Sequence, residues 1–147
     1  PDMALFLFTK AILEGKPINV FNNGNMIRDF TYIDDIVESL IRIIDKKASP
    51  DKEFNSKEPS PSTSWAPYRV FNIGNSQPTE LMEYISAIEN CLQIKAKKTF
   101  LPMQPGDVPE TASETTALDE WIGFKPSTSI QEGVRLFVSW YRNFYKV

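Results

Sequence analysis

One short stretch constrains the fold more than any other, because it joins a fixed cation to the start of a strongly patterned helix. Residues 28–35 read RDFTYIDD, and apolar side chains then recur at helical spacing as far as Ile44. This spacing predicts a helix with one apolar face, which we expect to be buried. Thr31 is a candidate cap, and Asp34 and Asp35 fall in the first turn, where the helix dipole favours carboxylates.

Arg28 lies just before this helix, in a segment that has the character of a short strand or a loop. A guanidinium held there suits a phosphate better than a flexible lysine would, because its planar donors can bind two oxygens at once. The alternative is that Arg28 pairs with Asp29 or Asp34 and has no further role. Spacing alone slightly favours the ion pair.

The composition is that of a soluble globular chain of one domain's length. The 147 residues are 41% hydrophobic and 24% charged, a balance that suits a packed core. No apolar run is long enough to cross a membrane, and nothing resembles a signal peptide, so we expect no membrane partner. Cys91 is the single cysteine, which fits a reducing, cytoplasmic compartment. The chain opens at Pro1 without an initiator methionine, so we expect it to be the middle of something longer.

Metal and nucleic-acid chemistry are both disfavoured. The chain has no histidine and one cysteine, so the commonest zinc ligands are missing and we expect no metal site. Its net charge of -3 and the absence of a basic cluster argue against a nucleic-acid partner. A negative protein can still bind an anionic ligand through local cations, and arginines are scarce here.

Short strands alternating with helices predict an α/β fold. Several of the helices should bury one face, so we expect them to share a common sheet. The turn at 22–25 is hairpin-like, because Asn and Gly tolerate positive φ, and its return strand would carry Arg28. Thr79 is a candidate cap, and Ser129 forms a capping box with Glu132. The predicted helices are 2–15, 33–46, 80–92, 116–121 and 130–144. The predicted strands are 18–21, 26–30, 68–74 and 97–101. Two loops are predicted, one over 48–67 that is rich in Pro and Ser, and one over 102–109.

Five motifs, in order, carry a resemblance to a known family. They are PDMA, RDFTYIDD, FNIGN, QPGDVPET and GFKPSTSIQEGV. The chain resembles the C-terminal half of an extended short-chain dehydrogenase/reductase (SDR), of the NAD-dependent epimerase/dehydratase family with its Rossmann-type fold. Within that family it is most similar to the nucleotide-sugar epimerases, and the long 48–67 loop favours the UDP-glucuronate 4-epimerase type. Residues 1–147 would then be a single substrate-binding fragment, some of whose elements complete the nucleotide-domain sheet. We expect the apolar faces that meet the rest of such a protein to be either exposed or covered by another copy in a dimer.

The resemblance implies an isomerase that uses NAD, a UDP-sugar substrate and a homodimer. In this family a Tyr-Lys pair moves the proton of the sugar 4-hydroxyl, while hydride passes to NAD and returns to the other face of the sugar. The sequence has neither a Tyr followed four residues later by Lys nor a Gly-rich phosphate loop after a strand. We therefore assign no catalytic residue here and expect this chain to be inactive alone.

The resemblance also implies contacts near the uridine. Met3 and Ala4 match positions that approach the uridine diphosphate, and Ile18, Asn19 and Phe21 match the strand that borders uracil. Phe21 offers a flat apolar face to a base. The alternative is that Ile18 and Phe21 simply alternate in a sheet.

Four further positions match the rest of the substrate site. Arg28 matches the arginine that holds the pyrophosphate, and Asp107 matches an aspartate that accepts hydrogen bonds from the ribose. Leu81 matches an apolar residue of the nucleotide pocket, although its helical stripe explains it equally well. Gln104 stands where galactose-type enzymes have a second phosphate-binding arginine, so it could donate only a neutral hydrogen bond. For Asp107 the alternative is a local Asx-turn.

Two other functions stay open from the sequence. A 4,6-dehydratase or a decarboxylase of the same superfamily would differ mainly in residues outside this chain. A non-catalytic binding or oligomerisation module is the second alternative, supported by the missing Tyr-Lys pair. A shared location of Arg28 and Asp107 would favour nucleotide binding over a mere interaction module.

Overall fold

The computed structural model describes residues 3–147 and separates them into two compact units. Unit 1 contains the residues as far as Phe30, then Gln77–Ala112 and Thr128–Val147. Unit 2 contains Thr31–Ser76 and Ser113–Ser127. Neither unit is continuous in sequence, so each depends on contacts between distant segments.

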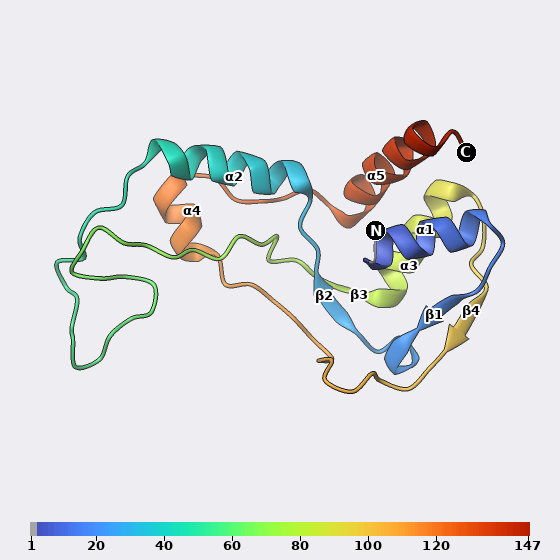
Figure 1. Cartoon of the computed structure of the whole chain (residues 1–147), viewed down its shortest axis with the longest axis horizontal. Helices are drawn as coiled ribbons and strands as arrows, with labels where there is room; N and C mark the ends of the chain where they lie inside the picture. Colours follow the sequence, from blue (N-terminus) through green and yellow to red (C-terminus); the bar gives the residue numbers. More distant parts are fainter. Residues whose placement is uncertain (1–2) are drawn as a thin grey trace. The chain divides into compact units, whose positions relative to one another are not determined.

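Three helices form the core of unit 1 among the described residues (Figure 1). They are α1 (Ala4–Leu13), α3 (Leu81–Leu92) and α5 (Ile130–Tyr145). Figure 1 shows α3 beside α1 and α5, and α3 packs against both. Ile85 and Ile88 on α3 are fully buried, and burial of one such side chain typically contributes about 1.5–3 kcal/mol. The helix predicted over 2–15 is therefore present, with Asp2 outside the described residues.

The strands are short and form separate pairs rather than one sheet. β1 (Ile18–Val20) pairs in parallel with β4 (Lys98–Phe100), and β2 (Ile27–Asp29) pairs antiparallel with β3 (Pro78–Glu80). The expected common sheet is wrong for the part of the chain that the structure describes, which holds two sheets of two strands. The helices of unit 1 bury their apolar faces against one another and so do not need a shared sheet.

The predicted hairpin-like turn is also wrong. Residues Phe21–Gly24 form a 3-10 turn, η1, in which Asn22, Asn23 and Gly24 have φ values of 49°, 51° and 86°. A Cβ on Gly24 would lie 3.0 Å from the sulfur of Met82 in α3, so the turn packs closely against that helix. After β1 the turn η1 packs against Met82 of α3, and β2 forms its ladder of hydrogen bonds with β3 rather than with β1.

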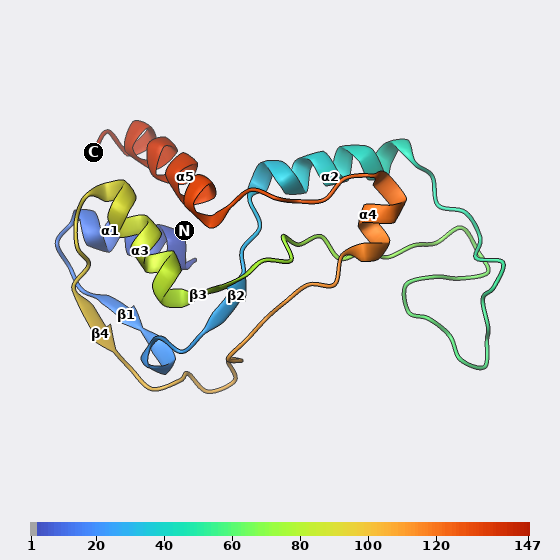
Figure 2. The ribbon, with the colours of Figure 1, turned by 180° about the vertical axis from the view of Figure 1, so that it is seen from behind.

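Unit 2 contains two helices among its described residues, α2 (Ile33–Asp45) and α4 (Thr116–Ile122). They lie close together in both views (Figures 1 and 2), and the Lys46 ammonium donates to the Trp121 carbonyl oxygen at 2.5 Å. Ser39 is the fully buried residue of α2. The predicted helix and the acidic first turn are confirmed.

The general expectation that each helix buries its apolar face is wrong for α2, whereas exposure of an apolar face is what we expect of a fragment. Five of its seven large aliphatic side chains are exposed, namely Ile33 60%, Val37 44%, Leu40 47%, Ile41 52% and Ile44 78%, whereas Ile36 and Ile43 are half-buried. The Ser39 side of the helix is buried, whereas the side that carries these five residues is largely open to solvent. α2 is thus amphipathic as predicted but presents its apolar face outwards.

The strand predicted over 68–74 does not form. Arg69 makes an isolated antiparallel bridge with Thr63, and the residues that follow have no regular pairing. A strand needs a neighbour to satisfy its backbone groups, and the described residues supply none here. The loop predicted over 48–67 is confirmed as irregular.

Two predicted helix caps are wrong. α2 begins after Tyr32 and α3 begins after Glu80, and neither helix has a side-chain cap hydrogen bond. The Thr79 hydroxyl instead donates to the Gln77 carbonyl at 3.1 Å, because Thr79 lies within β3. Thr31 is one residue too early in an extended segment to reach the first turn of α2.

The third predicted cap is confirmed in part. The Ser129 hydroxyl accepts a hydrogen bond from the Glu132 amide at 3.2 Å at the start of α5. The Glu132 carboxylate binds the Arg135 guanidinium at 2.7 Å. Ser129 therefore supplies the expected N-cap, while Glu132 supports an ion pair on the helix surface.

Candidate functional site

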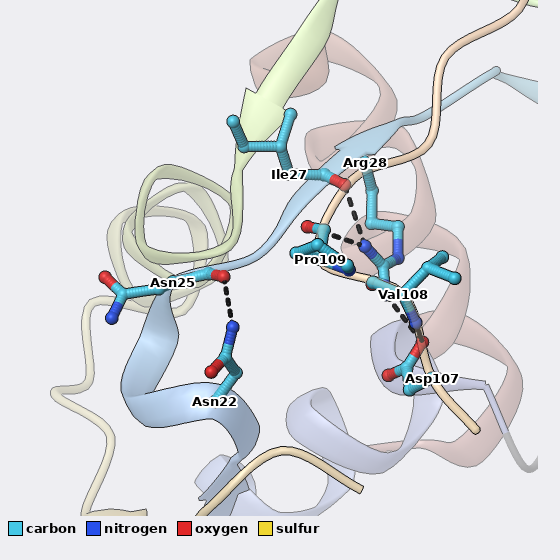
Figure 3. A network of polar contacts seen from close by, with 7 residues as sticks. All are labelled: Asn22, Asn25, Ile27, Arg28, Asp107, Val108 and Pro109. Atoms are coloured by element: carbon cyan, nitrogen blue, oxygen red, sulfur yellow. Dashed lines mark hydrogen bonds and ion pairs between the residues drawn. The ribbon is translucent and has the colours of Figure 1, made fainter. Parts of the chain in front are cut away.

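Arg28 and Asp107 meet in unit 1 (Figure 3). The Nη2 of Arg28 lies 2.9 Å from the Oδ1 of Asp107, and the two side chains are 24% and 34% exposed. Arg28 comes from β2, and Asp107 comes from the loop after β4, 79 residues further along the chain. The two residues that the sequence assigned to a phosphate and a ribose therefore share one location.

Backbone carbonyls complete the surroundings of the Arg28 guanidinium. Nη1 donates to the carbonyls of Ile27 at 2.8 Å and Pro109 at 3.2 Å. Nη2 donates to the carbonyl of Val108 at 2.8 Å as well as to Asp107. Each terminal nitrogen thus has two acceptors, whereas the Nε–H of Arg28 has no hydrogen-bond partner among the described residues.

Both sides of this pair are held by local structure. β2 is bound to β3 on one edge, and Ile27 forms a parallel bridge with Glu110 on the other. The Pro-Gly-Asp turn is possible because Gly106 adopts φ 83°. The amide of Asp107 donates to the Gln104 carbonyl at 3.2 Å, and its carboxylate accepts from the Val108 amide at 2.8 Å. An Asx-turn would bond the amide two residues on, but that residue is Pro109, which has no N–H; the carboxylate instead bonds the neighbouring Val108 amide while it pairs with Arg28.

A hollow of about 350 Å³ lies beside β2. Its lining includes Asn25, Met26, Ile27, Met82 and Pro109, together with the acidic residues Glu80 and Glu110. Ile27 and Pro109 are also the residues whose carbonyls hold Arg28 (Figure 3). None of the nine residues assigned from the sequence lines this hollow, because it is assembled from segments that no local motif connects.

The remaining assigned residues are spread over unit 1. Met3 precedes α1 and is 73% exposed, and Ala4 opens that helix. Asn19 is exposed on β1, and Phe21 is half-buried at the start of η1. Both could present polar or aromatic groups to a ligand.

Of the other three assigned residues, two are packed in or against the core and one is exposed. The Ile18 side chain is 2% exposed and its amide donates to the Lys97 carbonyl at 2.8 Å, so Ile18 belongs to the core. Leu81 packs against the core, and its amide donates to the Met26 carbonyl at 2.8 Å. Gln104 is exposed, and its contact with the site is the hydrogen bond that its carbonyl accepts from the Asp107 amide.

The most strongly shifted carboxyl lies away from this site. Glu89 in α3 is 4% exposed and binds the ammonium groups of Lys95 and Lys98 and the amide of Ala96. Burial opposes its ionisation, but these bonds outweigh burial and lower the pKa of Glu89 to about 2. The cluster ties the end of α3 to β4 and is structural.

The described residues offer neither a metal-binding cluster nor a membrane-spanning helix. No group of His, Cys, Asp and Glu side chains in residues 3–147 is arranged to hold a metal ion. No helix in the same range combines the length and hydropathy that a membrane span requires.

The comparisons with known proteins identify the family. The model of the GDP-mannose 4,6-dehydratase family matches residues 3–137. The chain belongs to this family. This membership confirms the resemblance to the C-terminal part of an extended SDR of the epimerase/dehydratase type.

Individual relatives refine the placement within the family. The chain is 55% identical to protein CapI of Staphylococcus aureus, over 99% of this chain and 44% of CapI. It is 45% identical to a probable UDP-glucuronate 4-epimerase of Rhizobium meliloti strain 1021, over 99% of this chain and 43% of that protein. This chain therefore spans less than half of the length of these relatives.

A solved structure confirms the fold class. The crystal structure of UDP-glucuronic acid 4-epimerase from Bacillus cereus, in complex with UDP-glucuronic acid and NAD, matches with a TM-score of 0.78 and 26% identity. The match covers 99% of this chain and 41% of the Bacillus chain. The α/β arrangement of short strands and packed helices is thus that of the C-terminal portion of SDR-type epimerases.

Proposed function

We propose that this chain is the substrate-binding part of an NAD-dependent nucleotide-sugar 4-epimerase that interconverts UDP-glucuronate and UDP-galacturonate. The observation that carries the proposal is the ion pair between Arg28 and Asp107 at 2.9 Å. It supports a shared site for the diphosphate and the ribose of one nucleotide. The names of the relatives from Rhizobium meliloti and Bacillus cereus support the acidic sugar.

Arg28 would bind the diphosphate by exchanging partners. Its Nε–H has no acceptor among the described residues and would donate to one phosphate oxygen. A second bond requires Nη2 to release Asp107 or the Val108 carbonyl. A phosphate oxygen is a strong acceptor for a guanidinium, so this exchange keeps a charge-assisted bond. The released Asp107 carboxylate is then free to accept from ribose hydroxyls.

The other assigned residues would complete the nucleotide site. The half-buried ring of Phe21 would lie against the uracil, and the exposed Asn19 would offer polar groups to its edge. Met3, Ala4 and Leu81 would supply apolar contacts, and Ile18 would act through its backbone because its side chain is buried. Gln104 would donate a neutral hydrogen bond.

NAD does not fit the residues of this chain. A dinucleotide loop needs clustered glycines between a strand and a helix, whereas the glycines here are scattered and Gly24 packs against Met82. NAD and the Tyr-Lys pair would therefore belong to residues outside this chain, in a cytoplasmic homodimer. The isolated chain would bind substrate without turning it over.

Two other functions keep specific support. The description of the matching family favours a 4,6-dehydratase, and a decarboxylase of the same superfamily would need a similar nucleotide site. A non-catalytic binding or oligomerisation module is supported by the exposed apolar face of α2. Binding of UDP to unit 1 would argue against a pure interaction module.

Titration calorimetry with UDP and UDP-glucuronate tests the proposal. The wild-type chain should bind both, and Arg28→Ala should abolish the heat signal. Arg142→Ala is the matched control, because Arg142 is an exposed arginine on α5 away from β2. If circular dichroism shows a folded chain that binds neither ligand, or if both variants bind equally, the assignment of Arg28 is wrong.

A further inference from the structure

Arg69 in unit 2 carries a guanidinium whose hydrogen-bond donors are unused among the described residues. Its side chain is 20% exposed, and it lies just after the 48–67 loop. None of the N–H groups of this side chain donates a hydrogen bond to any residue in 3–147, and its Nε is buried. Buried polar groups nearly always have a hydrogen-bond partner, so this guanidinium requires an acceptor from outside the described residues.

The carboxylate that lies beside Arg69 does not meet this requirement. The Oδ2 of Asp51 is 3.9 Å from the Nη1 of Arg69, which is beyond hydrogen-bond length. Hydrogen bonding by Thr63, and then by the Glu53 amide at 3.0 Å, lowers the pKa of Asp51, and the charge of Arg69 contributes least. Asp51 is therefore held mainly by other donors, and Arg69 keeps its own donors unused.

Arg42 of α2 shows how a guanidinium of the same unit is normally satisfied. Arg42 lies over the Phe124 ring at 4.9 Å, much as Arg69 lies over the Trp121 ring at 5.5 Å. The Nε of Arg42, however, donates to the Glu38 carboxylate at 2.7 Å. Stacking on an aromatic ring thus leaves the donors of a guanidinium available, and the two arginines differ in whether an acceptor is present.

A hollow of about 260 Å³, here called the Arg69 hollow, lies beside this side chain. Arg69 is part of its lining, together with the hydroxyl residues Ser62 and Thr63. Apolar residues form another part of the lining, namely Val70, Ala117 and Trp121. An apolar wall with a few polar groups and one charged group is the usual composition of a small-molecule site.

We propose that the Arg69 hollow binds a small organic anion that has one carboxylate on a short apolar body. A carboxylate matches the planar donors of a guanidinium and would accept charge-assisted hydrogen bonds from Arg69. The apolar body would contact Ala117 and Trp121. Glu120 also lines the hollow, and its like charge disfavours a dianion such as phosphate. This site lies in unit 2 and is independent of the proposed function, which rests on Arg28 in unit 1.

NMR titration of the arginine side chains tests the site, because each arginine gives its own Nε–H signal. The probe is benzoate, which joins one carboxylate to an aromatic ring. Acetate supplies the carboxylate without the ring, and inorganic phosphate supplies more charge. Benzoate should shift the Nε–H signal of Arg69 and should bind at least about tenfold more tightly than acetate or phosphate, because its ring adds apolar contact.

Two variants should weaken benzoate binding, and one should not. Arg69→Met removes the donors while its stem can still cover Trp121, so the affinity should fall at least about tenfold. Ala117→Leu, at an exposed position of α4, should have a similar effect because it fills the hollow. Arg42→Met is the matched control and should bind benzoate as the wild type does. The indole N–H signal of Trp121 reports binding in all three variants.

Several results would overturn the proposal. They are an Arg69 signal that benzoate does not shift, equal affinities for benzoate and acetate, and unchanged benzoate binding by Ala117→Leu or by a folded Arg69→Met. Circular dichroism checks the fold, and Ala117→Leu decides alone if Arg69→Met does not fold. UDP should shift the signal of Arg28 and leave that of Arg69 in place, so a failure of this site is distinguishable from a failure of the nucleotide site.

Discussion

The rings of Phe30 and Tyr84 stack with centroids 4.2 Å apart and an angle of 15° between their planes. Phe30 follows β2 directly, and Tyr84 lies in α3 with 3% exposure. Burial raises the pKa of the Tyr84 phenol, so the ring stays neutral at every physiological pH. The stack therefore fastens the strand that carries Arg28 to the core of unit 1.

Phe30→Ala should weaken both the fold and the site. Loss of a half-buried ring should lower the free energy of unfolding by about 2–3 kcal/mol. The affinity for UDP should fall as well, because β2 loses an anchor two residues after Arg28. Phe30→Leu keeps the apolar contact and should lower the free energy of unfolding by only about 1 kcal/mol. Urea unfolding and calorimetry measure the two effects; an unchanged UDP affinity in a destabilised Phe30→Ala would show that the stack does not position β2.

Asp107→Ala should change the binding of two ligands in opposite directions. Asp107 pairs with Arg28 and so competes with a diphosphate for the same guanidinium. Removal of the carboxylate should therefore strengthen the binding of inorganic pyrophosphate. UDP should bind about tenfold or more weakly, because the ribose loses its acceptor.

Asp107→Asn serves as the control for this pair of titrations. The amide oxygen can still accept from a hydroxyl, so the loss of UDP affinity should be smaller than with alanine. If both ligands bind more tightly to Asp107→Ala, Asp107 only competes for Arg28 and does not contact the ribose.

Local patterns predicted the helices well, because an amphipathic repeat is a property of a single segment. α2 begins and ends within about one residue of its predicted limits. The same pattern could not show that α2 faces outwards, since burial depends on what the rest of the unit offers. The 68–74 segment fails as a strand for a related reason: its alternation is local, but its pairing needs a neighbour elsewhere.

The candidate site was predictable only in part. Arg28 and Asp107 were assigned from the family motifs, and their contact joins residues that no spacing rule connects. Asn25 and Met82 of the nearby hollow were missed, because neither carries a sequence signal for binding. The buried side chain of Ile18 shows the opposite limit, since a motif position can belong to the core.

Glu89 should make stability depend on acid. Its pKa is lowered from 4.5 to about 2 in the folded chain, so its contribution is complete above pH 4.5 and is lost as the pH falls towards 2. The shift corresponds to about 3 kcal/mol at neutral pH, of which about 2 kcal/mol should be lost by pH 3. Urea unfolding at both pH values measures this loss.

Glu89→Gln isolates that contribution from the other carboxyl groups. The free energy difference between wild type and variant should be large at pH 7 and should shrink by about 2 kcal/mol at pH 3, because both proteins share every other titrating group. When Lys98→Met is added to both proteins, their free energy difference should change less between pH 7 and pH 3. The reason is that Lys98→Met removes one of the ammonium groups that bind Glu89. A difference that is equal at both pH values would show that Glu89 titrates normally.

The N-cap of α5 should be worth about 1 kcal/mol. Ser129 accepts from the Glu132 amide at 3.2 Å, and α5 packs against α3 in the core of unit 1. Ser129→Ala should therefore lower the free energy of unfolding by that amount, while Ser129→Asp should restore it, because a carboxylate can accept the same bond and also favours the helix dipole. Ser139→Ala, in the exposed middle of α5, should be neutral or slightly stabilising, because alanine has the higher helix propensity. An unchanged free energy of unfolding for Ser129→Ala in urea unfolding would mean that α5 gains nothing from its cap.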